Sequence, residues 1–262
     1  MSEFRSCSFS FWAAFFSVLL IVALAGCGAP NVKPIEDPRT QFELARKLFD
    51  RGKYFQAESE FQRFIYNFPG NTAIDTAQYL LSMCYYKDKD YALGAGEFKK
   101  LLTSFPASDF ADDAQYRLAM CHYFQSPGYA LDQTDTFIAI EEFSNFLDNY
   151  PGSEFEDSVV IYLKDMRDKV AQKTFSTARL YQKLNYFDPA IMYYDRVLED
   201  SPDSPFVPEA LFRKGECYIK LEKYIQAREA FLEYIEKYKD QKYYEKATSA
   251  LRRLEDMPQA EK

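Results

Sequence analysis

Apolar and polar residues alternate with a helical period along most of this 262-residue chain. Between residues 40 and 51, and again between 55 and 67, apolar side chains recur every three or four positions, which is typical of amphipathic helices. Gly52 lies between the two segments and suits the left-handed position that ends a helix. Pro69 ends the second segment, because the residue before a proline is steered away from the helical conformation. The pattern therefore predicts a pair of helices joined by a short turn.

The same helix pair is encoded five times along the chain. Each copy has a small residue, a second small residue in the next helix, and an aromatic residue four positions later. The five sets are Ala45-Ala57-Phe61, Ser82-Gly94-Phe98, Ala119-Ala139-Phe143, Ala178-Ala190-Tyr194 and Gly215-Ala227-Phe231. Their middle residues are 37, 45, 51 and 37 positions apart, and a period in this range indicates stacked supersecondary units. We expect the small residues to let the helices approach and the aromatic residues to fill the remaining space.

Departures from the repeat divide the chain into further segments. An eight-residue insertion around Ser126–Asp135 predicts a loop between the two helices of the third unit. Residues 154–184 contain no Gly or Pro and predict one long helix or two nearly continuous ones. We therefore expect three N-terminal units over residues 38–153. Residues 154–257 would hold the joining helix, two further units and a terminal helix, and 258–262 would form a tail.

The repeated frame resembles the tetratricopeptide repeat, with a connector that lengthens the usual unit of about 34 residues. This resemblance implies an all-α, right-handed α-solenoid of about five helix pairs, whose first helices line a concave groove. The positions that face such a groove are Phe42, Arg46, Phe49, Tyr79, Met83, Tyr86, Tyr116, Met120, Tyr123 and Phe124. Aromatic and methionine side chains suit an extended segment with aromatic residues, because they make adaptable apolar contacts. The alternative is that some of these residues only pack between repeats.

The first 27 residues have the layout of a secretory leader. Arg5 precedes an apolar stretch from Phe9 to Ala25, and the following Leu24-Ala25-Gly26-Cys27 resembles the lipobox of bacterial lipoprotein precursors. The resemblance implies that residues 1–26 are a signal peptide, that Cys27 carries diacylglycerol and an N-acyl chain, and that residues 27–37 form a flexible linker. Gly28 replaces the aspartate that retains such proteins in the inner membrane, so we expect the periplasmic face of the outer membrane. The alternative is an uncleaved membrane anchor.

Composition and chemistry argue for a scaffold rather than an enzyme. The net charge of -8 argues against nucleic-acid binding, which needs a basic surface. The single histidine, His122, occupies a repeat position held elsewhere by Leu or Tyr, so we expect it to pack in the core. Cysteine and histidine show no metal-ligand spacing, so we expect no metal and no cofactor beyond the lipid. The internal cysteines occupy equivalent repeat positions too far apart for bridges, and we expect buried free thiols at Cys84, Cys121 and Cys217.

Together, the lipobox, the five units, the Pro-x-Ser-x-Phe connectors and the third-unit insertion resemble the BamD (YfiO or ComL) family of outer-membrane assembly lipoproteins. This resemblance implies a non-enzymatic component of the β-barrel assembly machinery. Its C-terminal units would bind the periplasmic POTRA domains of a BamA-like barrel, and its N-terminal units would receive unfolded β-barrel substrates. Other assembly lipoproteins would be further partners. The alternative is another envelope scaffold, such as a secretin pilotin or a cell-division coordinator.

Overall fold

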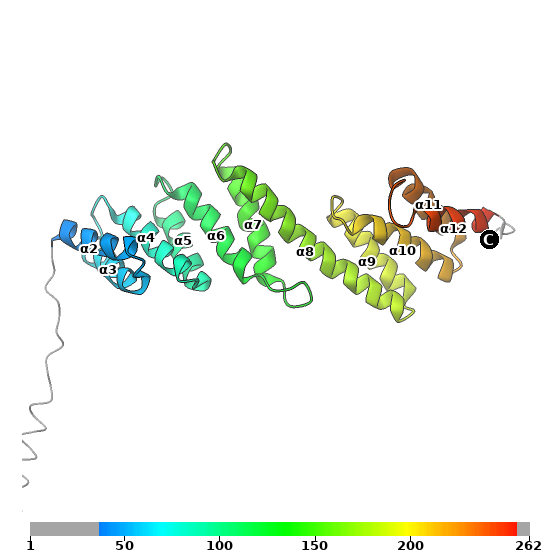
Figure 1. The fold of residues 1–262 in the computed structure, drawn as a ribbon, viewed down its shortest axis with the longest axis horizontal. Coiled ribbons are helices and arrows are strands. Elements are labelled where there is room, and N and C mark those ends of the chain that lie inside the picture. Colours follow the sequence, from blue (N-terminus) through cyan, green and yellow to red (C-terminus); the bar gives the residue numbers. More distant parts are fainter. Residues whose placement is uncertain (1–36, 256–262) are drawn as a thin grey trace, which may run out of the picture. The chain divides into compact units, whose positions relative to one another are not determined.

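The structure is a computed structural model that describes residues 37–255 of the chain. The described part folds into eleven α-helices (Figure 1). In chain order they are α2 (Pro38–Asp50), α3 (Tyr54–Asn67), α4 (Ile74–Lys87), α5 (Tyr91–Ser104), α6 (Ala111–Gln125), α7 (Thr134–Asn149), α8 (Glu156–Lys183), α9 (Phe187–Asp200), α10 (Val207–Lys220), α11 (Tyr224–Lys237) and α12 (Tyr244–Glu255). Each helix packs against the next one along the chain. The prediction of an all-helical array of helix pairs is confirmed. The predicted leader, Cys27 and the tail 258–262 lie outside the described residues.

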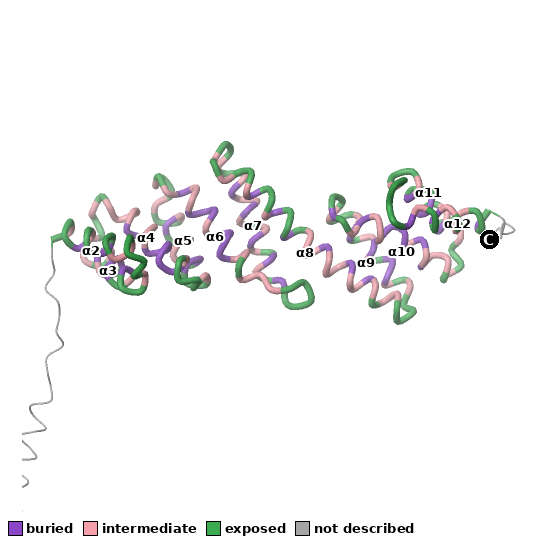
Figure 2. Tube along the Cα trace, in the orientation of Figure 1, coloured by how far each residue is buried: buried purple, intermediate pink, exposed green. Residues whose placement is uncertain are grey.

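The repeated small and aromatic residues form the contacts within each helix pair. Every member of the five sets is buried, and the five aromatic rings are fully enclosed. Figure 2 shows the buried positions along the sides where neighbouring helices face one another. At Gly215 the approach is so close that a Cβ atom would lie 2.8 Å from ring carbons of Phe231. The small residues are therefore required by the distance between the helices, as the sequence pattern predicted.

A left-handed residue ends the first helix of four units. Gly52 has φ 71° in the first unit, and the equivalent positions are held by Lys89, Asn185 and Glu222, with φ between 59° and 64°. In each case the next backbone N–H donates to a carbonyl of the helix that has just ended, for example from Lys53 to Leu48 at 3.0 Å. The turn thus closes the same way whether or not the residue is glycine, although a side chain at positive φ is strained.

Helix α8 belongs to two neighbouring parts of the array. Its 28 residues confirm the prediction of one long helix. The first half buries Val159, Leu163 and Met166 against α6 and α7, and the second half buries Ala171, Phe175 and Ala178 against α9 and α10. The second stripe begins one position later than a continuation of the first would. One residue of α-helix corresponds to a rotation of about 100°, so the two halves bury different faces.

The insertion of the third unit is an ordered loop that contacts the middle of α8. The buried amide of Gln133 donates to the carbonyl oxygens of Gly128, Leu131 and Asp132 at 3.0–3.2 Å. Outside the loop, Lys173 of α8 donates to the Leu131 carbonyl at 2.5 Å, and Lys169 donates to the hydroxyl of Ser126 at 2.9 Å. The loop therefore contacts α8 at Lys169 and Lys173, close to the point where its buried face changes.

Candidate functional site

The ten residues assigned to a groove all come from the first helices α2, α4 and α6. These helices, together with α8, contact one another in sequence as a row. Met83, Tyr116 and Met120 are buried, with at most 8% of each residue exposed. Arg46 and Phe124 are exposed, and Phe124 keeps 48% of its surface accessible. The remaining five residues, Phe42, Phe49, Tyr79, Tyr86 and Tyr123, are half-buried. Packing between repeats, which the sequence left as the alternative, therefore describes Met83, Tyr116 and Met120.

Stacked aromatic pairs explain why part of the row is covered. Tyr79 stacks on Phe110 with ring centroids 4.4 Å apart, and Tyr116 stacks on Phe155 at 4.5 Å. The same stacking recurs between Phe175 and Phe206 at 5.4 Å and between Phe212 and Tyr243 at 4.6 Å. In each pair the second ring belongs to the connector that follows the helix pair. The connector aromatic thus covers the first helix of the preceding unit.

A constant sequence separation is the signal that could have revealed these pairs. The two partners are 31 residues apart in three units and 39 apart across the eight-residue insertion. In the first unit the same interval leads from Phe42 to Ala73, which has no ring. Phe42 instead packs on Phe61 and Phe64, with centroids 6.1 and 5.3 Å away. The first unit is therefore the one whose first-helix aromatic lacks a connector ring over it.

Arg117 of α6 lies at the centre of the row and was missed in the sequence analysis. Its guanidinium pairs with Asp113 at 2.9 Å and lies over the rings of Tyr86 and Tyr116, 5.4 and 5.2 Å from the centroids. Asp113 also accepts a hydrogen bond from the hydroxyl of Tyr79. Burial, together with the Asp113 carboxylate, raises the pKa of Tyr79, which keeps this phenol protonated. The i, i+4 spacing of Asp113 and Arg117 was a visible signal for this pair.

An aromatic cluster continues the row toward α8. Phe124 stacks on Tyr91 at 4.9 Å, and the neighbouring Tyr123 meets Tyr162 edge to face at 4.9 Å. The hydroxyl of Tyr123 donates to Asp165 of α8 at 3.0 Å. Burial and this carboxylate raise the pKa of Tyr123 to about 12. Phe124 is therefore an exposed ring that is held in place by its contact with Tyr91.

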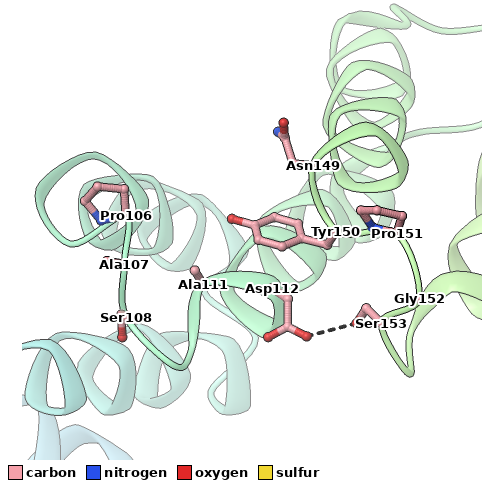
Figure 3. Close-up of a pocket in the computed structure, with 10 residues that line it drawn as sticks. All are labelled: Pro106, Ala107, Ser108, Ala111, Asp112, Asn149, Tyr150, Pro151, Gly152 and Ser153. Atoms are coloured by element: carbon pink, nitrogen blue, oxygen red, sulfur yellow. Dashed lines mark hydrogen bonds between the residues drawn. The ribbon is translucent and has the colours of Figure 1, made fainter.

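A separate shallow cleft lies between two connectors (Figure 3). It has a volume of about 480 Å³ and lies between the Pro106 and Pro151 turns, with the ring of Tyr150 on one side. Inside it, Ser153 donates to Asp112 at 2.9 Å, and Ser108 makes the equivalent bond to Asp75 at 2.8 Å. This bond therefore ties these two connectors to the units that precede them.

The histidine and the internal cysteines make structural contacts. The Nδ1 atom of His122 lies 3.0 Å from a carboxylate oxygen of Asp135, and the side chain is only half-buried. The prediction of a core histidine is therefore corrected: His122 joins the end of α6 to the start of α7. The internal cysteines are free and buried as predicted, and burial raises the pKa of each thiol to about 12. Within residues 37–255 no group of three or more His, Cys, Asp or Glu side chains could hold a metal ion.

The fold and this surface define a helical-repeat scaffold of the tetratricopeptide type. Comparison with known families shows more: the family YfiO, described as outer membrane lipoprotein, matches residues 36–230. The chain belongs to this family of outer membrane lipoproteins. Across the described residues, no helix combines the length and apolar character that crossing a membrane requires.

Curated relatives are similar at low identity. The outer membrane protein assembly factor BamD of Rickettsia prowazekii is 22% identical over 209 residues, which cover 78% of this chain and 83% of that protein. The protein of the same name from Caulobacter vibrioides is 24% identical over 169 residues, which cover 64% of this chain and 43% of that protein.

Two of the solved structures similar to this chain carry tetratricopeptide repeats in their names. The TPR2AB domain of yeast Sti1 has 12% identity and a TM-score of 0.45, with 83% of each chain covered. YrrB, described as a TPR protein with an unusual peptide-binding site, has 15% identity and a TM-score of 0.34, with 81% of this chain and 92% of that chain covered.

Proposed function

We propose that this chain is a non-enzymatic, lipid-anchored component of the machinery that assembles β-barrel proteins in the outer membrane. The observation that carries the proposal is the family match over residues 36–230, supported by two curated relatives that are named assembly factors. Cys27 would carry the lipid, and residues 154–257 would bind the periplasmic POTRA domains of a BamA-like barrel. Other assembly lipoproteins would join the same complex.

The first-helix face of α2, α4 and α6 is the proposed surface for unfolded β-barrel substrates. Its accessible side chains combine the exposed ring of Phe124 with two cationic groups, Arg46 and the partly exposed Arg117. An aromatic ring would pack on Phe124 and Tyr91, and a carboxylate would pair with a guanidinium. An extended segment that ends in an aromatic residue and a terminal carboxylate fits both kinds of contact.

Purification of the mature lipoprotein from detergent-solubilised membranes tests membership in the assembly machinery. We expect co-purification of a barrel protein with POTRA domains, and a purified sample without such a barrel would refute the proposal. Mass spectrometry of the same sample tests the anchor: we expect the chain to begin at an acylated Cys27. An unmodified Cys27, or a chain that still begins at Met1, would contradict the lipid anchor.

Binding of a peptide with a C-terminal phenylalanine tests the substrate surface. The double variant Phe124→Ser/Arg46→Gln should weaken binding severalfold while the protein stays folded, with only the small fall in melting temperature that loss of the Phe124–Tyr91 stack causes. Phe137→Ser is the matched control, since Phe137 is 57% exposed on the second helix α7, outside the first-helix row. Unchanged affinity in the double variant would refute the assignment of this surface.

A further inference from the structure

The outer side of α3 has an unusual composition for an exposed helix. Its five exposed residues are all uncharged: Phe55, Gln56, Ser59, Gln62 and Tyr66. Phe55 is 75% exposed and Tyr66 is 86% exposed, and their separation of eleven positions corresponds to about three helical turns. The two rings therefore lie on one line along the helix. Among the described residues, these two rings are the most exposed of the large hydrophobic side chains.

The charged residues of α3 and its neighbour α5 reinforce this pattern. The carboxylate of Glu58 accepts from the Tyr85 hydroxyl at 2.8 Å, and that of Glu97 accepts from the Gln78 amide at 2.6 Å. Glu60 is buried beside Arg63. The charged side chains that α3 and α5 expose are thus Lys99 and Lys100.

The second helices of the later units differ in this respect. Each of them exposes acidic side chains: Glu141 and Asp148 on α7, Asp188, Glu199 and Asp200 on α9, and Glu229, Glu233 and Glu236 on α11. Within the described second helices, an exposed surface without carboxylates is confined to α3 and α5. These are the second helices of the two units that follow the linker.

We propose that the outer face of α3 and α5 rests on the phospholipid surface to which the chain is anchored. The inference depends on the lipid anchor of the proposed function. Eleven residues from Cys27 to Pro38 span at most about 40 Å when fully extended, so the first unit stays close to the headgroups. Phe and Tyr rings pack well at the boundary between headgroups and acyl chains. Lys99 and Lys100 are attracted to anionic lipids, although Lys100 also pairs at 3.5 Å with Glu97 of the same helix, whose side chain is 26% exposed.

A single tryptophan reports on this contact. The only tryptophan of the chain is Trp12, in the predicted leader, so a mature Tyr66→Trp variant carries one reporter. The lipidated full-length mature protein is reconstituted into vesicles of phosphatidylethanolamine and phosphatidylglycerol, with or without brominated acyl chains. We expect the emission of Tyr66→Trp to shift to the blue and to lose most of its intensity in brominated vesicles. The matched control is Ile225→Trp on α11, where Ile225 is 68% exposed, and it should show neither change.

The outcomes separate this inference from the function on which it rests. Quenching that is absent in Tyr66→Trp, or equal in both variants, refutes the lipid contact even if a POTRA-containing barrel still co-purifies. Failure of the protein to stay on the vesicles refutes the anchor and this inference together. Adding Lys99→Glu and Lys100→Glu to Tyr66→Trp should reduce the quenching, whereas adding Glu233→Lys should not. Unchanged quenching after the lysine substitutions would show that charge plays no part in the contact.

Discussion

Two glycines within helices offer a direct test of how closely the repeat units pack. Both Gly96 in α5 and Gly215 in α10 lie in helix interiors, where alanine is favoured over glycine by about 0.5–1 kcal/mol. A Cβ atom at Gly96 would meet nothing within 4 Å, whereas at Gly215 it would lie 2.8 Å from the Cε1 and Cζ atoms of Phe231. Replacing glycine with alanine therefore favours the helical backbone equally at both positions, but it creates a steric clash only at Gly215.

The expected change in the free energy of unfolding for Gly215→Ala follows from the space around Phe231. Carbon atoms in contact prefer a separation of about 3.5–4.0 Å, so the ring or the helix would have to move by more than half an ångström. The ring is completely buried and packs against Phe212 at 5.7 Å, which limits its movement. Overpacking of this kind costs about 1–3 kcal/mol. We expect Gly215→Ala to lower the free energy of unfolding by about 1–2 kcal/mol, and Gly96→Ala to raise it by about 0.5–1 kcal/mol.

The assay is urea unfolding followed by circular dichroism, with hydrogen exchange resolved by segment. Repeat arrays can open unit by unit, so the exchange data assign the change to the last units. In a Phe231→Leu background the cost of Gly215→Ala should shrink, because the smaller side chain leaves space for the methyl group. Gly215→Ala as stabilising as Gly96→Ala would refute the reasoning.

Three further predictions use other contacts. Gln133→Ala should destabilise the insertion loop by about 1 kcal/mol because three loop carbonyl groups lose their hydrogen-bond donor, and faster hydrogen exchange over residues 128–136 would report it; unchanged exchange would contradict the role of this amide. Burial raises the pKa of Glu209, but Arg213 outweighs it and holds that pKa below 4.5, so stability from this pair is present above pH 4.5 and is lost as the pH falls. Arg213→Met should therefore flatten the acid limb of a stability-against-pH curve, and a curve parallel to wild type would contradict this. The three internal thiols should react with a thiol reagent at neutral pH only in denaturant, because burial raises each pKa to about 12; labelling of the native protein would contradict it.

Most of the fold was predictable because it depends on contacts local to one unit. Small residues such as Ala45 and aromatic residues such as Phe61 recur at fixed spacing, and each set packs within its own helix pair. The change of buried face along α8 was not predictable in the same way. It depends on which helices lie beside each half, and residues 154–184 show no break where the stripe moves.

The candidate site was only partly predictable, for a related reason. Sequence spacing correctly placed Tyr79 and Tyr116 on the first helices, but it left open whether they line a groove or pack between repeats. Their exposure is decided by Phe110 and Phe155, which come from the following connectors. Arg117 was missed because its partners lie on three elements, α4, α6 and the connector after α7. Side chains that are brought together by tertiary packing leave a weaker trace than those that share one helix.

The offset between the two buried stripes of α8 determines the rotation of the units after this helix relative to the units before it. Each stripe packs in its own core, so the angle between the two stripes is set by the residue count from Met166 to Ala171. Deleting one residue in that interval would leave both cores intact and turn the later units by about 100° around the helix axis. The angle between the units before and after α8 is therefore encoded as a number of residues.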